Sequence, residues 1–565
     1  MVNRDTWRYH DATMPVYDVI LIHPPAVYDF REKPIFPGAL GRDMATVQFN
    51  KVPIGMLSIA DYLDRHGYQV VVDNLCDRML TSPGFDVEQH LRALSARVFG
   101  IGLSFQQHAP GALAIARLVK ELHPDALVIM GGLTATRFHE EIVTKYEFVD
   151  AVVRAEAEKP LLQLLRAYET KGRLTPTPNL TYRDDSGAVT VTPLMEASSD
   201  LDDFEFTRLD LLDPQTSVHI PGAPSRWSLV VCRGCAYDCA ICGGSAYTYK
   251  KYFGMPRPAF RSPAKVVSDV QKLIAQNVRF IGLYQDPRVG GRRYWQELVD
   301  RFVQEKPVFE RLSLDLLAPA GEDFISEVAK IGTNVILHFC PDTGSDQVRG
   351  ALGRHYTNDD IRATIKACLK YRIPVTNFFS VGLAGETEKE MRETWQLWQE
   401  LDALNKEAFK SSGMQYIKDA IPAGGQVLGP IVLDPGSRAF DDPAAHGYRL
   451  LYEDLERYVE GLSQPTWDQW LNYETSLLDR KSMLDLIYQT MEFVIDQRER
   501  DGLYGGSQAF YERCHLHADR VIVNEMESVR ALSDPQERED RAVRMRETLD
   551  ALEKKRTFFS MAFVK

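Results

Sequence analysis

The stretch that decides the fold is Cys232-Arg-Gly-Cys235-Ala-Tyr-Asp-Cys239-Ala-Ile-Cys242-Gly-Gly, which follows an apolar run. It gathers four of the chain's eight cysteines within eleven residues. In a reducing compartment, such a cluster is typical of a metal or redox site rather than of disulfides. The other four cysteines are isolated, and we interpret them as small buried hydrophobic residues: Cys76, Cys340, Cys368 and Cys514.

Three of these cysteines have a spacing that suits an iron–sulfur cube. Cys235, Cys239 and Cys242 form C-x3-C-x2-C, so three thiolates can fold round one [4Fe–4S] cluster and leave its fourth iron without a cysteine. Cys232 is then a strand-end residue. Two alternatives would use Cys232 as well: a structural zinc site, or a four-cysteine cluster for electron transfer alone. Zinc modules usually separate their cysteine pairs by more residues, so the open cluster is favoured.

The region around the cysteines predicts a barrel of alternating strands and helices. Expected strands are 227–232, 279–284, 312–316, 334–339, 374–381 and 414–417. Expected helices are 262–276, 293–304, 322–331, 359–371 and 388–401. Short apolar strands joined by single helices indicate a parallel sheet. Six such units over residues 223–430 predict a partial (β/α)6 barrel, with its active site at the carboxyl ends of the strands.

Residues 225 to 425 resemble the radical S-adenosylmethionine (SAM) superfamily. The cysteine loop, Asp342-Thr-Gly-Ser345 and Val381-Gly-Leu-Ala-Gly-Glu386 match its motifs in order, while Ile241 replaces the usual aromatic residue. The resemblance implies that the open iron binds SAM and that an electron cleaves it to a 5′-deoxyadenosyl radical. It also implies SAM contacts from Tyr237, Ile241, Gly243, Gln285, Asp286, Asp342, Ser345, Gly382 and Glu386.

Residues 1–170 predict a doubly wound parallel sheet. Expected strands are 17–23, 70–72, 98–104, 126–130 and 151–153, and expected helices include 54–63 and 112–122. Ligands in such sheets bind at the carboxyl ends of the strands. Those ends carry Pro24-Pro25, Ser104, Gly131-Gly132-Leu-Thr134 and Arg154-Ala-Glu156.

This first region resembles the cobalamin-binding domain that precedes many radical SAM enzymes. The resemblance implies cobalamin contacts from Pro24, Pro25, Ile54, Gly55, Ser104, Gly131, Gly132, Thr134 and Glu156. The D-x-H-x-x-G motif of older cobalamin domains is missing, so no histidine is an obvious ligand for the lower face of cobalt. His23 is interpreted as a packing residue, and His108 is the weaker alternative ligand. A domain that keeps the fold without the cofactor is the other interpretation.

The remaining segments are less informative. Residues 171–222 predict a linker, and residues 431–565 a mainly helical domain with helices at 448–461, 481–498, 508–532 and 535–555. Two motifs there, Asp434-Pro-Gly-Ser-Arg438 and Trp467-Asp-Gln-Trp470, could line a substrate pocket or simply pack in the core.

The composition narrows the possible partners. The formal net charge of -13 argues against broad binding to nucleic acid or to anionic membranes. The sequence shows no signal-peptide pattern and no stretch long enough to span a membrane, so a cytoplasmic location is expected.

The two resemblances together predict a cobalamin-dependent radical SAM enzyme that methylates an unactivated carbon of a small-molecule, natural-product or lipid substrate. An electron donor such as flavodoxin or ferredoxin would supply the electron. Cyclisation or rearrangement without methyl transfer is the alternative reaction. An iron–sulfur electron carrier or regulator is the alternative of another class.

Overall fold

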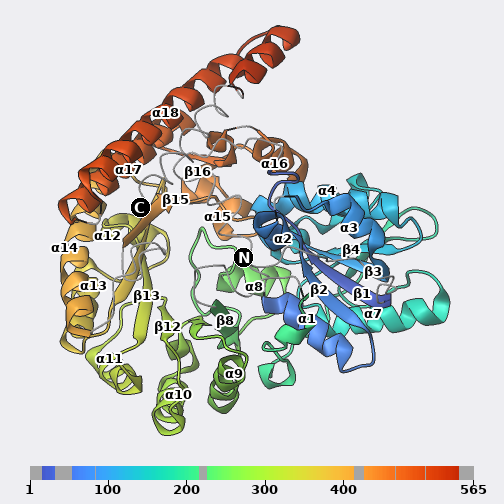
Figure 1. Cartoon of the computed structure of the whole chain (residues 1–565), viewed down its shortest axis with the longest axis horizontal. Coiled ribbons are helices and arrows are strands. Elements are labelled where there is room, and N and C mark those ends of the chain that lie inside the picture. Colours follow the sequence, from blue (N-terminus) through green and yellow to red (C-terminus); the bar gives the residue numbers. More distant parts are fainter. Residues whose placement is uncertain are drawn as a thin grey trace, which may run out of the picture.

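The computed structural model describes residues 16–31, 54–82, 84–214, 226–412, 426–464, 466–502, 504–545 and 547. Figure 1 shows the blue-to-cyan first domain beside a green-to-yellow barrel, with the orange-to-red C-terminal elements lying along both. The predicted α/β class is confirmed: two sheets of parallel strands carry the first two thirds of the chain.

The first sheet has seven strands in the order β2-β1-β3-β4-β5-β6-β7. Its five parallel strands are β1 (Val16–His23), β2 (Val70–Asn74), β3 (Ser95–Gly102), β4 (Leu127–Gly131) and β5 (Ala151–Val153). The order 2-1-3-4-5 is a doubly wound arrangement in which the chain reverses direction between β1 and β3. A ligand is therefore expected beyond the carboxyl ends of β1 and β3.

Helices cover both faces of this sheet because its strands are apolar on both sides. α1 (Ile54–Asp64) and α7 (Glu158–Lys171) bury leucines against one face, while α3 (Val87–Ala93) and α4 (Ala109–Leu122) cover the other. Three short helices complete the domain: α2 (Leu75–Thr81), α5 (Leu133–Arg137) and α6 (His139–Lys145).

The segment 171–222 is more ordered than a linker. It contributes β6 (Leu180–Arg183) and β7 (Val189–Val191), which pair antiparallel on the edge of the first sheet beside β5. Its threonines and prolines suggested irregular structure, but Leu180, Thr181 and Tyr182 are all buried, and threonine and tyrosine are residues that strands favour. Residues 215–222 lie outside the described residues.

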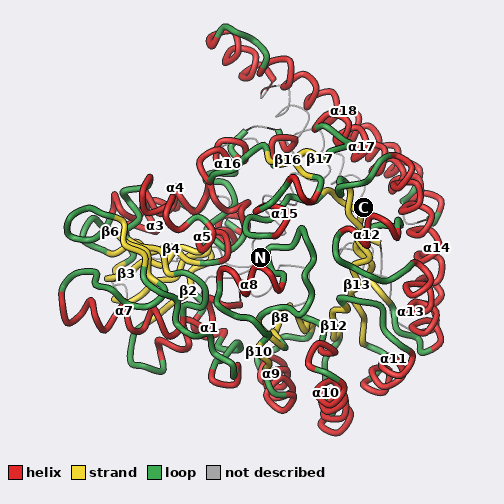
Figure 2. Tube along the Cα trace, turned by 180° about the vertical axis from the view of Figure 1, so that it is seen from behind, coloured by secondary structure: helices red, strands yellow, loops and turns green. Residues whose placement is uncertain are grey.

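The second sheet is an open barrel of six parallel strands in the order β15-β14-β13-β12-β11-β8. The strands are β8 (Arg226–Val230), β11 (Phe280–Tyr284), β12 (Arg311–Leu316), β13 (Val335–Asp342), β14 (Val375–Val381) and β15 (Gln426–Pro430). Figure 2 shows them as an arc with their helices outside it. The helices are α9 (Pro263–Ala275), α10 (Arg292–Glu305), α11 (Glu322–Val328), α12 (Asp346–Ala351), α13 (Asn358–Lys370) and α14 (Glu388–Ser412).

The sequence analysis located the first five barrel strands but not the sixth. The expected strand 414–417 lies outside the described residues, and β15 pairs with β14 instead. α14 runs eleven residues beyond its expected end at Leu401, because Ala408 continues its buried face. The longer helix moves the return strand further along the chain.

The C-terminal elements are mostly helical, with one exception. Residues 448–461 were expected to form one helix, but Tyr448–Leu450 is strand β16, paired with β17 (Tyr473–Thr475), and α16 spans only Leu455–Leu462. The long helices α17 (Arg480–Arg500) and α18 (Gly506–Arg530) pack together on the outside (Figure 1). None of the described helices is both long and apolar enough to cross a membrane.

The tryptophan motif of this domain is part of the core. Trp467 and Trp470 are 4% and 3% exposed, and the Trp467 indole donates a hydrogen bond to Asp519 at 3.0 Å. Tyr488 donates to the same carboxylate oxygen at 2.8 Å. The packing interpretation of these residues is therefore confirmed.

At Gly111, helix α4 lies in direct contact with the backbone that follows β1. Its backbone N–H donates to the Ala26 carbonyl at 3.0 Å, and a Cβ at this position would lie 1.9 Å from the Pro25 carbonyl oxygen. We predict that Gly111→Ala lowers the free energy of unfolding by about 2–4 kcal/mol, measured by urea denaturation, because the backbone must separate. Gly350→Ala, in α12 with open space around it, should change stability by about 1 kcal/mol or less. Equal effects would contradict this account.

Candidate active site

The cysteine loop lies between the two sheets. It follows β8 and the short strand β9 (Cys232–Arg233), and it leads into α8 (Ala246–Tyr252), which lies between the first domain and the barrel (Figure 1). We call residues 235–242 the cluster loop. Its position at the carboxyl end of β8 agrees with the expected location of an active site in a parallel barrel.

The environment of the cysteines separates Cys232 from the other three. Cys235 and Cys242 each accept a backbone N–H hydrogen bond on sulfur, from Tyr237 at 3.4 Å and Gly244 at 3.3 Å. Cys232 instead sits in the paired strands β9 and β10 (Ala259–Phe260), where its thiol donates to the Gly234 carbonyl at 3.8 Å. Hydrogen bonds to sulfur are a feature of iron–sulfur loops, so the donor set fits a cluster on three cysteines.

A buried arginine supplies positive charge beside these thiols. Burial raises the pKa of the Cys235 and Cys239 thiols, and the Arg354 guanidinium opposes that rise in both. Arg354 also forms an ion pair with Asp342 at 2.7 Å and donates to the Cys340 carbonyl at 2.9 Å. A fixed cation favours the thiolates that a cluster requires.

Within the described ranges, no three His, Cys, Asp or Glu side chains meet at one point as they would around a single metal ion. A [4Fe–4S] cube is bound through separate iron atoms at different corners, so its cysteines need to face one cavity and not one point.

The glycine-rich turn after β14 is stabilised by hydrogen bonds to one of its own residues, Glu386. Gly382 adopts a positive φ of 90°, and the N–H groups of Gly382 and Leu383 both donate to Glu386 Oε2 at 2.9 Å. The Gly382 carbonyl accepts from Tyr473, and Tyr448 accepts from the Ala384 N–H. Burial raises the pKa of Glu386 to about 8. Glu386 Oε2 therefore braces the turn, while Oε1 has no hydrogen-bond partner among the described residues, and the SAM contact of Glu386 stays a prediction.

Asp286 has a similar supporting role. It is fully buried, and its two oxygens accept hydrogen bonds from the Arg288 backbone and guanidinium and from the Leu317 N–H at 2.6–3.0 Å. Its neighbour Gln285 has a positive φ of 77° and a buried side-chain oxygen that finds no hydrogen-bond partner in the described part of the chain. Of this predicted pair, Gln285 is the one available to a ligand.

The other predicted SAM residues are close to the loop or to the ends of the strands. Ile241 packs with Val348, Leu352 and Leu383, so it covers one side of the loop by apolar contact. Ser345 is buried at the start of α12, where its N–H donates to Thr343 at 3.2 Å.

The sequence analysis did not foresee that residues 434–441 close over the cluster loop. Asp434 accepts the Gly243 N–H at 3.0 Å, and the Ala439 N–H donates to the Ala240 carbonyl at 2.8 Å. Arg438 forms an ion pair with Asp238. The Asp-Pro-Gly-Ser sequence indicates a turn. The neighbouring residues do not show that this turn bonds the cluster loop, which lies some 190 residues earlier in the chain.

The same segment reaches the first domain through Asp441. This carboxylate accepts from Tyr247 at 3.0 Å and Tyr252 at 2.7 Å and pairs with Lys251 at 2.8 Å, all on α8. It also pairs at 3.3 Å with Arg137 of α5, which follows the Gly131-Gly132 turn. One carboxylate therefore connects all three parts of the chain.

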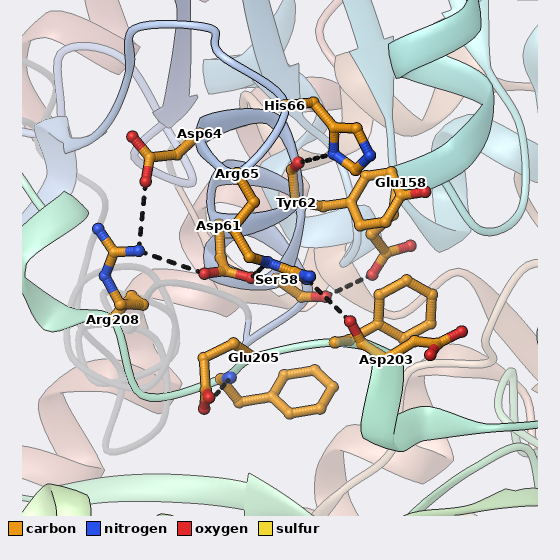
Figure 3. A network of polar contacts seen from close by, with 12 residues as sticks. Ser58, Asp61, Tyr62, Asp64, Arg65, His66, Glu158, Asp203, Glu205 and Arg208 are labelled. Carbon is orange, nitrogen blue, oxygen red and sulfur yellow. Dashed lines mark hydrogen bonds and ion pairs between the residues drawn. The ribbon is translucent and has the colours of Figure 1, made fainter.

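A second connection starts two residues before Cys235. Arg233 pairs with Glu156 at 3.1 Å and with the buried Glu158, and Ser58 of α1 donates to Glu158 at 2.6 Å. Figure 3 shows Ser58 and Glu158 within the wider polar network of α1. The other Glu156 oxygen accepts the Ser198 N–H at 3.1 Å. Glu156 is thus bonded within the domain interface, and its contact with cobalamin stays a prediction.

Figure 3 also shows how the segment before the barrel docks on α1. Arg208 pairs with Asp61 at 3.4 Å and Asp64 at 3.2 Å, and Arg65 donates to the Asp203 carbonyl at 2.8 Å. These ion pairs fix the end of the expected linker against the first domain.

The predicted cobalamin residues gather at the chain reversal of the first sheet. Gly132 has a φ of 113°, and a Cβ there would lie 2.7 Å from the Leu103 and Ser104 backbone. Thr134 donates to the Ser104 carbonyl at 3.1 Å. Pro24 and Pro25 follow the adjacent β1, while Ile54 and Gly55 begin α1.

Two features at this end of the sheet fit a large polar ligand. Gln106 is 2% exposed, and neither of its amide atoms has a hydrogen-bond partner among the described residues. Buried amides are nearly always bonded, so this one marks a place for a ligand group. His23 and His108 pack with ring centroids 4.9 Å apart, and burial together with His23 lowers the pKa of His108 well below its usual value, which keeps it neutral.

Comparisons with known proteins agree with this division. A model of the B12 binding domain matches residues 43–165, and a model of the radical SAM superfamily matches residues 229–397.

The chain therefore contains a B12-binding domain followed by a radical SAM domain. Its expected cofactors, a [4Fe–4S] cluster, SAM and cobalamin, are those of this pair of domains.

Individual relatives are distant. An uncharacterised methyltransferase of Pyrococcus horikoshii is 21% identical over 396 residues, covering 69% of this chain and 79% of the relative. The anaerobic magnesium-protoporphyrin IX monomethyl ester cyclase of Rubrivivax gelatinosus is 23% identical and covers 62% of this chain. The chain spans 63% of that cyclase, which is less than two thirds of its length.

Two solved structures share the fold. The cobalamin-dependent radical SAM enzyme OxsB, with aqua-cobalamin bound, gives a TM-score of 0.56 at 14% identity, covering 94% of this chain and 75% of OxsB. The radical SAM methyltransferase TsrM from Kitasatospora setae, with cobalamin and a [4Fe–4S] cluster bound, gives 0.53 at 18% identity over 77% of each chain.

The Arg233 ion pairs yield a stability prediction. Glu158→Ala leaves a buried guanidinium short of a counter-charge, so the free energy of unfolding should fall by about 3–5 kcal/mol in urea denaturation. The matched control is Glu88→Ala, which breaks an exposed pair with Arg92 and should cost under about 1 kcal/mol. A Glu158→Ala variant as stable as the control would show that the interface does not depend on this pair.

Proposed function

We propose that this radical SAM protein transfers a methyl group to an unactivated carbon of a small-molecule, natural-product or lipid substrate. One observation carries the proposal: the cluster loop lies against the first domain through Arg233 and against the C-terminal segment through Asp434. The carboxyl ends of both sheets can then serve one reaction chamber, which methyl transfer between two cofactors requires.

In this proposal Cys235, Cys239 and Cys242 hold the cluster, while residues at the ends of β1, β3 and β4 hold cobalamin. When bound, the cluster supplies the electron that cleaves SAM, and cobalamin supplies a methyl group. A carbon without nucleophilic character cannot accept a methyl group directly from SAM, which explains why the two domains occur together.

The side chains of the barrel have positioning roles. Ile241 and its apolar neighbours exclude water from one side of the loop, and Gln285 offers an amide oxygen to the amino group of SAM. Arg354 stabilises the anionic sulfurs and is itself fixed by Asp342. Residues 434–441 close the chamber, because an exposed radical would react with solvent components.

Cyclisation without methyl transfer is the second candidate, and the similarity to the magnesium-protoporphyrin ester cyclase favours it. Both reactions need an external electron, and we propose reduced flavodoxin or ferredoxin as its source.

The cluster assignment is tested by replacing cysteines. Each of the variants Cys235→Ala, Cys239→Ala and Cys242→Ala should lose nearly all bound iron and sulfide after anaerobic reconstitution. The reason is that the two remaining thiolates are too few to hold the cluster. Cys232→Ala should retain most of both, and it serves as the matched control. Loss in the Cys232 variant equal to the other three would indicate a four-cysteine site instead.

The reaction type is tested with methyl-labelled SAM. Reconstituted enzyme with cobalamin, a strong reductant and candidate substrates should form 5′-deoxyadenosine, S-adenosylhomocysteine and a product that carries the label. A product without the label, formed together with 5′-deoxyadenosine, would refute methyl transfer and favour cyclisation or rearrangement. Absence of 5′-deoxyadenosine with a full cluster and turnover of substrate would refute radical chemistry.

A further inference from the structure

Part of the inner face of the barrel is accessible to water, most clearly on β8 and β12. On β12, Leu312, Leu314 and Leu316 point to the helices and are at most 1% exposed, whereas the alternate residues are partly exposed. β13 alternates in this way only over residues 337–341, and β14 only over residues 377–381, while Ile336 and Thr376 are buried. Since successive side chains of a strand point to opposite faces, the partly exposed set lines the interior.

The strand register stacks these inner residues in layers. Gly282 pairs with Ser228 and Ser313, and a Cβ on Gly282 would lie 3.2–3.3 Å from both serine hydroxyls. This middle layer is therefore narrow and polar. The layer above it, nearest the cluster loop, contains Tyr284 and Asp315, with His338 3.5 Å from Asp315.

In the lowest layer, two arginines make cation–π contacts with the same phenylalanine ring. Phe280 pairs with Arg226 on one side and Arg311 on the other. Their guanidinium carbons lie 5.6 Å and 4.9 Å from the Phe280 ring centre. The Nε of Arg226 is buried and has no hydrogen-bond partner within the described residues.

These arginines differ from the other buried arginines of the chain. Arg261 pairs with Asp269, and Arg349 pairs with Asp346. Within the described ranges, neither Arg226 nor Arg311 has a carboxylate partner, although acidic residues outnumber basic ones 79 to 66. Burial lowers the pKa of both, and Arg226 lowers that of Arg311 further. Two part-buried like charges without a counter-charge are unfavourable unless an anion joins them.

We propose that Arg226 and Arg311 bind the acidic end of an elongated substrate, a carboxylate or phosphate, which lies along the inner face of the barrel. The planar donor arrays of arginine suit both groups. Arg226 begins β8, and Val230 ends it four residues later, next to the cluster loop. The acidic group would therefore sit about 13 Å from the layer where the reaction occurs. This assignment of a substrate class rests on the proposed function.

The first test uses inorganic phosphate as the probe. Calorimetric titration of the full-length, anaerobically purified protein at constant ionic strength should detect phosphate binding. Arg226→Gln combined with Arg311→Gln should weaken it at least tenfold, while the double lysine variant should retain part of it. The control is Arg279→Gln, since Arg279 also lies at the start of β11 but bonds the Val308 carbonyl. No binding to the native protein, or equal binding to the double glutamine variant, would overturn the proposal.

The second test asks whether the bound molecule occupies the barrel interior. Below its micelle concentration, n-octyl phosphate should bind more tightly than phosphate because its chain lies along the inner face. Gly282→Val fills the narrow middle layer, so it should remove this gain and leave phosphate binding unchanged. Comparison with octanoate identifies the preferred acidic group. A gain that survives Gly282→Val would show that the arginines face only outward, against the proposal.

Circular dichroism confirms that each variant is folded. Neither titration requires SAM cleavage, so failure of these tests leaves the proposed function intact. Loss of methyl transfer would likewise leave the binding results interpretable.

Discussion

The ion pair between Arg233 and Glu158 constrains the position of everything around the cluster loop. Arg233 is two residues from Cys235, and its guanidinium is taken up by two carboxylates of the first domain. A buried charge that loses its partner is costly, so the loop cannot move away from that domain without breaking the interface. Asp434 and Asp441 secure the other side of the loop and α8. These charged contacts therefore add to a buried apolar core that includes residues of all three parts of the chain, and together they set the distance between the two cofactor-binding ends.

Much of the fold could be predicted from the sequence because its strands are short, apolar and regularly spaced. Strand 151–153 was located to the residue, and the helix 54–63 to within one residue. The hairpin β6–β7 was missed because its strands are short and contain threonine and tyrosine, which favour strands without forming a strong apolar run. The expected strand 414–417 lies outside the described residues, and β15, which pairs with β14, was not expected because helix α14 continues further than its local pattern suggested.

The candidate site could be predicted only where the signal lies in residues that are adjacent in the sequence. The C-x3-C-x2-C spacing and the position of Cys232 at a strand end follow from adjacent residues. The hydrogen bonds and ion pairs that Glu386, Asp286 and Glu156 make within the chain do not. A carboxylate in a motif can face a ligand or brace the backbone, and only the fold shows which hydrogen bonds it already makes. The contribution of residues 434–441 was unpredictable for the same reason, since their partners are remote in sequence.

Among the described residues the barrel is open, and its outermost strands, β8 and β15, each pair with a strand on one side only. Exposed strand edges recruit other chains unless something covers them. Here α1 of the first domain packs near β8, and α17 of the C-terminal domain packs against β15. The two flanking domains therefore cover the edge strands of the barrel, in addition to their proposed part in catalysis. A shortened protein that keeps only the barrel would expose both of these edges, and we expect it to aggregate.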